Sequence, residues 1–355
     1  MDVVTAPVIN THATIETSAV PRPVTLAVVA GALVLGAAAA FAVGGPNLFV
    51  GALVAGVVYV GGTTGSAFAV EGARKGRNRL AGSLITLAFL LAVAPLISLV
   101  WTVVERGAAR LDVAFFTEDM RNVLGQGGGA QHAIVGTLIM TGIATLISVP
   151  IGLLVSIYLV EYGRGRLARS VTTMVDVMTG IPSIVAGLFA YALFVIFEGP
   201  GVRLGLGGGV ALSVLMTPVV IRACEEMLRL VPNELREAAY ALGVPKWRTI
   251  LKVVVPTAIA GILTGIMLAI ARVIGETAPL LLIAGVTSDL NADPTEGRMA
   301  SLPVYAYYAY ATPGRQSEFA YDRGWAASLV LVLIVAVLFT LARILARVLQ
   351  PKGLR

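Results

Sequence analysis

The sequence predicts an all-α polytopic membrane protein, and three observations support this fold class. The chain of 355 residues is 57% hydrophobic and only 13% charged, with a mean hydropathy of +0.88, whereas soluble domains carry about 25% charged residues. Its apolar residues form continuous runs of roughly 20, the length of a membrane-spanning helix. Strands of a membrane barrel alternate apolar and polar residues instead, so the runs predict helices.

Eight apolar runs are candidate spans. The sixth is short for a bilayer core about 30 Å thick. The seventh is too long for one span and contains Arg272, Glu276 and Pro279, which predicts a break or a re-entrant segment. The eight runs lie near residues 24–43, 47–70, 80–104, 132–160, 171–197, 209–223, 252–285 and 325–349.

The positions of Lys and Arg predict the orientation of the chain. With a cytoplasmic N-terminus, 18 of the 26 basic residues fall in cytoplasmic segments and 7 on the opposite side, with Arg272 inside a membrane segment. We therefore expect a multi-pass protein with both termini in the cytoplasm. The net charge of +6 reflects this topology and does not indicate a nucleic-acid partner.

A change in composition divides the chain. Residues 1–23 are expected to form a cytoplasmic tail, residues 24–79 two additional transmembrane helices with a basic linker, and residues 80–355 the main transmembrane domain. The basic patch at 74–79 is also a weaker candidate for contact with anionic membrane lipid. The stretch 61–65, Gly-Gly-Thr-Thr-Gly, is expected to be a packing face for a neighbouring helix rather than a ligand site.

Several chemical devices are missing from the sequence. The sequence contains no G-x-x-x-x-G-K-[ST] phosphate-binding loop, which excludes ATP binding through that motif. The triplets Gly127–Gly129 and Gly207–Gly209 are expected to be flexible turns in outer connections. One cysteine, Cys224, excludes an internal disulfide and a multi-Cys metal site, and His12 and His132 form no metal or triad pair. We expect no enzymatic activity and no cofactor.

The segment at 232–252 is the most informative part of the sequence. Pro232 opens a helix, Gly243 suits the left-handed residue just past its C-terminus, and Pro245 starts a second helical turn. We therefore expect this segment to form a helix, a break and a second helix on the cytoplasmic side.

This segment also has the composition of a contact surface. Ala238 and Ala239 permit close approach of another surface, and Trp247 and Arg248 are typical of interface anchors. The alternative is an amphipathic helix that lies on the protein's own membrane.

Glu237-Ala238-Ala239, followed by Gly243 and Pro256, resembles the EAA loop of permease subunits of bacterial ABC importers, E-A-A-x3-G-x9-I-x-L-P. Valines at 253 and 255 replace the usual Ile and Leu. The resemblance covers about residues 80–350 and implies a six-helix, MetI-like permease core beside the two additional helices. It further implies that this loop forms coupling helices that dock on a separate ATPase subunit through Glu237, Ala238, Ala239, Gly243, Trp247 and Arg248.

Four further segments, 156–162, 179–187, 217–226 and 271–279, resemble the phosphate-importer (PstA-type) branch of that family. The resemblance implies translocation of inorganic phosphate across the bacterial cytoplasmic membrane. It implies as partners a homologous second permease, a dimer of ATPase subunits and an extracytoplasmic phosphate-binding protein. Import of another anion such as sulfate or molybdate or of a polar organic solute, ATP-independent transport, and an assembly role without transport stay open as alternatives.

Ionisable residues inside spans are candidates for a substrate pathway. Arg272 and Glu276 are four residues apart, so we expect them on one helix face and able to pair. A guanidinium matches the oxygens of phosphate, while Glu276 would limit how tightly an anion is held. The alternative is that Arg272 lies at the outer interface with its side chain reaching toward water.

Three other features remain open. Gly180-Ile181-Pro182 interrupts the fifth run, so Pro182 and Ser183 are pathway candidates in a broken helix, or mark a simple proline kink. Arg222 is expected to form a cluster with Glu225 and Glu226 that positions the coupling loop, or to contact substrate. The tyrosines of the 286–324 loop are expected to form an interfacial belt, with docking of an external protein as the alternative.

Overall fold

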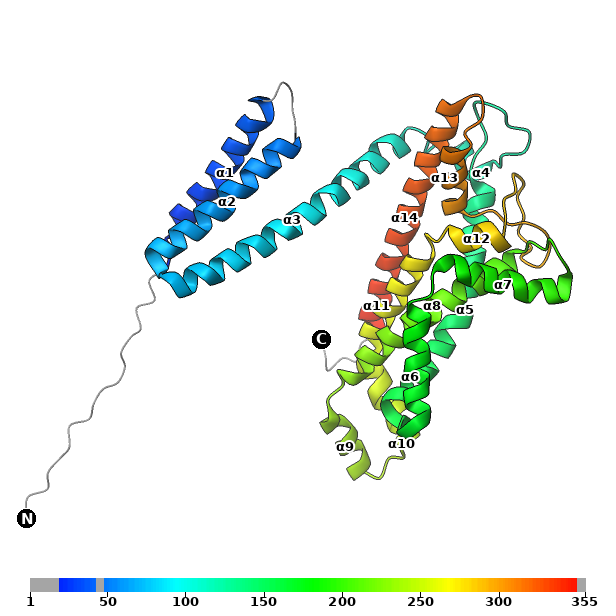
Figure 1. Ribbon diagram of the computed structural model, residues 1–355. Coiled ribbons are helices and arrows are strands. Elements are labelled where there is room, and N and C mark those ends of the chain that lie inside the picture. Colours follow the sequence, from blue (N-terminus) through cyan, green and yellow to red (C-terminus); the bar gives the residue numbers. More distant parts are fainter. Residues whose placement is uncertain (1–18, 43–47, 350–355) are drawn as a thin grey trace, which may run out of the picture. The chain divides into compact units, whose positions relative to one another are not determined.

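The computed structural model describes residues 19–42 and 48–349, and every regular element within these ranges is helical. The chain divides into two compact units, residues 1–100 and 101–355, and each has its own packing (Figure 1). Of the tail predicted for residues 1–23, only residues 19–23 are described, and a helix already begins at Arg22. Lys352 and Arg355 lie outside the described residues.

Seven helices in the described part of the chain are long and apolar enough to cross a membrane, or eight if one bent pair forms a single span. This agrees with the eight runs predicted from the sequence. The seven are α1 (Arg22–Ala42), α2 (Leu48–Glu71), α3 (Ala73–Ala108), α5 (Gln131–Ile157) with the π-helical turn η1 (Tyr158–Tyr162), α8 (Gly205–Arg229), the continuous α10 (Lys246–Thr249), η2 (Ile250–Val254) and α11 (Val255–Val273), and α14 (Ser317–Leu349).

The first unit contains α1, α2 and most of α3. A Cβ placed on Gly36 of α1 would lie 2.7 Å from the carbonyl oxygen of Gly51 on α2, and one on Gly62 would lie 2.6 Å from Val28. Small residues therefore let the two helices pack closely, as predicted for the glycine stretch. Gly61 and Gly65 have no neighbour within 4 Å, so only part of that stretch is a packing face in this chain.

In the second unit, α5 and α8 pack against each other along their length. A Cβ on Gly152 would lie 2.5 Å from the side chain of Val220. The hydroxyl of Ser148 donates to the carbonyl oxygen of Ser213 at 3.1 Å and lies 3.1 Å from the hydroxyl of Thr217. Inside a membrane the hydrophobic effect does not drive helices together, so small residues and interhelical hydrogen bonds hold them in contact. This contact forms the centre of the unit.

The triplet Gly207–Gly209 belongs to α8, so the expectation of a flexible turn at this triplet is wrong. A Cβ on the second or third glycine would lie 2.5 Å from Met140 or Ile143 of α5. Close helix packing selects glycine here, and α8 reaches 25 residues, long enough to span. The triplet Gly127–Gly129 does lie in a loop, with two positive φ angles.

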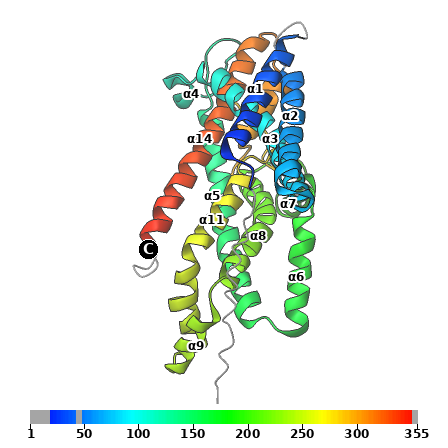
Figure 2. The ribbon, with the colours of Figure 1, turned by 90° about the vertical axis from the view of Figure 1, so that its left-hand side faces the viewer.

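The fifth run is broken. Helices α6 (Gly165–Thr179) and α7 (Ser183–Glu198) meet at an angle of 106°, and residues 180–182 lie outside both. Figure 1 shows α6 running along the unit and α7 turned across it, and Figure 2 views α7 nearly end-on. A continuous helix with a proline kink is therefore not what forms.

The seventh run is also broken, as predicted. Helix α11 ends at Val273, and the short helix α12 (Ala278–Ile283) follows. Helix α7 packs directly on α12, because a Cβ on Gly187 would lie 2.6 Å from Pro279 Cα. The two breaks are thereby brought together in the middle of the unit.

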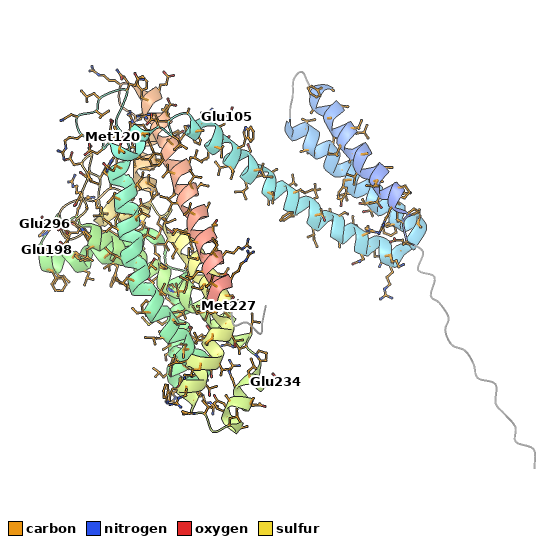
Figure 3. The ribbon with its side chains drawn as sticks, turned by 180° about the vertical axis from the view of Figure 1, so that it is seen from behind. Glu105, Met120, Glu198, Met227, Glu234 and Glu296 are labelled. Atoms are coloured by element: carbon orange, nitrogen blue, oxygen red, sulfur yellow. The ribbon has the colours of Figure 1, made fainter. Side chains whose placement is uncertain are left out.

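The two ends of the second unit carry different elements. Helix α9 (Asn233–Ala241) and α10 lie at one end, and α13 (Leu302–Ala311) with α4 (Val113–Thr117) lies at the other. Figure 3 labels Glu234 on α9 and Met120 just after α4 at these opposite ends. We refer to them as the α9 end and the α13 end.

The contact between α7 and α12 makes a prediction about Gly187. Replacing Gly187 with Ala places a methyl group against the backbone of Pro279, so the two helices must separate, at a cost of about 1–3 kcal/mol. We expect a lower midpoint in thermal unfolding of the purified protein. Gly142→Ala is the matched control, because a Cβ on Gly142 of α5 would have nothing within 4 Å. Equal midpoints for the two variants would contradict the close contact.

Candidate functional site

The segment at 232–252, between α8 and α11, forms the predicted helix, break and helix, and we call it the coupling segment. Pro232 precedes α9, and Gly243 has a φ of +75°. The amide of Gly243 donates to the carbonyl of Tyr240 at 2.9 Å, and the amide of Val244 donates to that of Ala239 at 3.1 Å. These bonds close the last turn of α9 with a left-handed residue. Pro245 then precedes α10.

The coupling segment exposes apolar side chains at the α9 end of the unit. Ala239 is buried against its own chain, while Glu237, Ala238 and Gly243 are exposed. The guanidinium of Arg248 lies over the ring of Trp247, 5.2 Å from its centre. The expected apolar face is therefore split, with one alanine facing inward. The large apolar side chains of the segment that stay exposed are Leu235, Tyr240, Leu242, Trp247 and Leu251.

A buried ion pair fixes α9 to the end of α5. The Nε of Arg236 donates to Glu161 at 2.9 Å, and the two side chains are only 12% and 5% exposed. Arg236 also donates to the carbonyl oxygens of Val231 at 2.6 Å and Leu228 at 3.0 Å. Burial weakens screening by water, so such a pair resists separation. Neither partner was among the site residues predicted from the sequence.

Lys246 makes a second connection to the same turn. Its ammonium donates to the backbone carbonyl of Glu161 and lies 4.7 Å from the ring centre of Tyr162. Glu161 and Tyr162 belong to η1, and the coupling segment continues into the second π-helical turn, η2. The segment is thus held at both of its helices by one turn at the end of α5.

Arg222 lies in an ion-pair cluster between α8 and α6. It donates to Glu225 at 2.7 Å and to Asp176 of α6, and Glu225 also accepts from Arg229 at 2.7 Å. The predicted partner Glu225 is present, whereas Glu226 is exposed and Asp176 takes its place. Arg222 is not among the residues that line the cavity at the helix breaks.

A polar cavity of about 190 Å³ lies where the two helix breaks meet. Ser183 lines it, and so do Arg272 and Glu276, so three of the pathway candidates come together. Pro182 does not line it, although its neighbours on both sides do. The other lining residues are Met178, Thr179, Ile181, Leu215, Val219 and Val273.

The expected pairing of Arg272 with Glu276 is not found. Helix α11 ends at Val273, and the amide of Glu276 donates to the carbonyl of Val273 at 3.0 Å, which turns the chain away from the helical path. Within the described residues, no ion pair joins these two side chains or ties either of them to another group. Both charges line the cavity instead.

This arrangement is suited to binding a small anion. Within the described residues the guanidinium of Arg272 forms no ion pair, and Thr179 and Ser183 line the same space. The hydroxyl of Thr179 donates to the carbonyl oxygen of Val175 at 2.9 Å. Broken helices at such points free polar groups to line a cavity inside a membrane protein. Among the described residues no group of three or more His, Cys, Asp or Glu side chains is placed to hold a metal ion.

Comparisons with known proteins agree with this architecture. The family of binding-protein-dependent transport system inner membrane components matches residues 148–354. The chain is 46% identical over 266 residues to phosphate transport system permease protein PstA 1 of Mycobacterium tuberculosis (strain CDC 1551 / Oshkosh), covering 74% of this chain and 86% of that protein. It is 39% identical over 277 residues to PstA of Yersinia pestis, covering 77% and 90%.

A chain in the crystal structure of a bacterial alginate ABC transporter, in complex with an alginate pentasaccharide-bound periplasmic protein, has a similar fold. The TM-score is 0.50 at 15% identity, over 75% of this chain and 93% of that one. At this identity the likeness concerns the fold alone, which is all-α and MetI-like as predicted. Together with the match of the sequence to the inner membrane component family and its permease relatives, this shows that the chain is a multi-pass membrane protein of the PstA permease family.

Proposed function

We propose that the chain is the permease subunit of an ATP-binding-cassette importer that carries inorganic phosphate across the bacterial cytoplasmic membrane. The observation that carries this proposal is the polar cavity at the two helix breaks, where Arg272 and Glu276 lie without ion-pair partners. The phosphate transport permeases among its relatives support the same cargo.

The chemistry of Glu276 favours phosphate over sulfate and molybdate. Near neutral pH phosphate keeps at least one proton and so offers a hydroxyl donor, whereas sulfate and molybdate are fully deprotonated. A carboxylate accepts a hydrogen bond from that hydroxyl but repels an anion that has no donor. In this proposal Arg272 attracts the anion, and Glu276 discriminates phosphate from sulfate and molybdate. Because the two charges oppose each other, the anion is held weakly enough to leave.

ATP hydrolysis takes place in a partner in this proposal. The coupling segment docks on a dimer of ATPase subunits, and Leu242, Trp247 and their exposed neighbours provide the contact. A homologous second permease completes the pathway, and an extracytoplasmic phosphate-binding protein delivers the anion at the α13 end. The α9 end is then cytoplasmic, in agreement with the excess of Lys and Arg there.

The contacts of the second unit suggest how movement reaches the cavity. Displacement of α9 acts on Glu161 through Arg236, and Glu161 lies in the turn that ends α5. Helix α5 packs on α8, and α8 contributes Leu215 and Val219 to the cavity. A push at the coupling segment therefore changes the space around Arg272. An ATP-independent carrier would not require this connection between the coupling segment and the cavity.

Two substitutions test the roles in the cavity. Arg272→Gln removes the charge that attracts phosphate, and we expect phosphate uptake by cells or vesicles to fall about 10- to 100-fold, the worth of one charge-assisted hydrogen bond. Glu276→Gln is expected to let excess sulfate inhibit phosphate uptake, and we expect no such inhibition in the unchanged protein. Arg169→Gln is the control, because Arg169 is exposed on α6 and away from the cavity. Normal uptake by both cavity variants would refute the pathway.

Gly243 tests the coupling segment. Its φ of +75° is tolerated by Asn but not by a β-branched residue, whose strain is about 1–3 kcal/mol. We expect Gly243→Val to lower the amount of ATPase subunit that co-purifies and Gly243→Asn to keep most of it. If both variants retain full ATPase binding and uptake, the segment does not dock as proposed.

Glu161 tests the connection between α9 and α5. Glu161→Gln leaves Arg236 buried without its carboxylate, and breaking such a pair costs about 3–5 kcal/mol. We expect the amides of α9 to exchange hydrogen at least tenfold faster, with little change in α14. Glu237→Gln is the matched control, since Glu237 is exposed. Equal exchange in the two variants would show that the ion pair does not hold α9.

A further inference from the structure

A second and larger cavity lies at the α13 end of the unit. Its volume is about 590 Å³. It is lined by the loop after α4, the start of α5, the loop after α12, α13, the loop that follows it and the start of α14. Met120, labelled in Figure 3, lies at its rim. It shares no lining residue with the cavity at the helix breaks. The proposed pathway makes no use of it.

A buried arginine is the main charge in this cavity. Arg323 is 8% exposed, and its Nη1 donates to the carbonyl oxygens of Gly125 at 2.7 Å and Gly127 at 3.2 Å. Both of these bonds come from Nη1, and in the described part of the chain no hydrogen bond of Nε or Nη2 meets the same geometry, although the side chain also acts on the hydroxyl of Tyr305. Within the described residues no carboxylate lies at ion-pair distance. A buried charge without a counter-charge is costly, so this arrangement calls for an anion.

Two further polar groups point to the same conclusion. Within the described residues, the Nδ1 of His132 has no hydrogen-bond partner, and this side chain is only 2% exposed. The buried hydroxyl of Tyr305 has no partner at hydrogen-bond geometry, although the Arg323 side chain lies close enough to act on it. The two rings lie edge to face, 5.4 Å apart, and both line the cavity. Burial raises the pKa of Tyr305 to about 12, so its hydroxyl remains a hydrogen-bond donor throughout the physiological range. Orphan polar groups of this kind need a ligand or water.

The nearby carboxylates do not neutralise the cavity. No Asp or Glu is among its lining residues, whereas Arg315 lines it together with Arg323. Asp289 pairs with Arg121 at 2.7 Å. Asp119 accepts hydrogen bonds from the backbone amides of Arg121 and Leu290, which hold the pKa of its carboxyl below the ordinary value. Neither carboxylate forms an ion pair with Arg323.

We propose that this cavity is a binding site for a tetrahedral oxyanion, held by the guanidinium of Arg323 with hydrogen bonds from Tyr305 and His132. A guanidinium and neutral donors around one space match the oxygens of phosphate or sulfate. The groups are buried, so a small free anion reaches them more readily than an acidic side chain on a protein surface. The site itself stands independently of the proposed transport function. Its placement on the outer side of the membrane rests on the orientation proposed above.

The test is direct binding of inorganic phosphate to the purified full-length chain, measured with radiolabelled phosphate. An Arg272→Gln background keeps the other cavity from contributing. We expect saturable binding in this background, with affinity lowered about tenfold or more by Arg323→Gln, because one charge-assisted bond is lost. Tyr305→Phe is expected to lower it several-fold. This variant removes a single oxygen, so it keeps the test valid if Arg323→Gln fails to fold.

Arg106→Gln is the control, because Arg106 is an exposed arginine that does not line the cavity. We expect this variant to bind phosphate with unchanged affinity.

Competition by sulfate would support an oxyanion site in general. Absence of saturable binding, or binding insensitive to both cavity substitutions, would overturn the proposal and leave a water-filled cavity. Loss of binding-protein docking in Arg323→Gln without any phosphate binding would also overturn it and assign the arginine to a protein contact. Loss of transport alone, with binding intact, concerns the proposed function and not this site.

Discussion

The close contact of α5 with α8 is the constraint on which the second unit depends. Glycines and hydroxyl residues bring the two backbones together, and this contact places the functional elements at both ends and in the middle. The turn that ends α5 supplies Glu161 to the coupling segment, and its first turn supplies His132 to the cavity at the α13 end. Helix α8 supplies one wall of the cavity at the helix breaks. A larger side chain in this contact would disturb all three.

The sequence predicted the helical class, the number of spans, the break in the seventh run and the turn at Gly243, because hydropathy, proline and glycine act locally. For the fifth run it left a broken helix and a proline kink open. It failed where the partner of a residue lies far along the chain. The glycines at 207–209 have the composition of a turn, and only the nearness of Met140 and Ile143 explains them as packing positions. Likewise Arg272 and Glu276 have the spacing of a helical pair, but α11 ends between them. The pair Arg236–Glu161 joins residues 75 apart, so no local pattern indicates it.

The arginines of this chain differ in how their charge is compensated, and this difference separates structural from binding roles. Arg222 and Arg236 each reach a carboxylate and so hold helices together. Arg272 and Arg323 line cavities and form no ion pair with any residue that the structure describes. Desolvating a charge is expensive, and an unpaired arginine persists in a folded protein when water or an anion satisfies it. Whether an arginine has an ion-pair partner is therefore a better guide to its role here than the residue type alone.

Two weak anion sites also suit a transporter better than one strong site. A single deep site slows release in proportion to its affinity, because most differences in affinity appear in the rate of dissociation. In the proposed pathway, an anion that reaches the cavity of Arg272 and Glu276 meets opposing charges there and is not held firmly. We propose that movement of α9 opens the way between the two cavities, so that neither site has to hold the anion tightly.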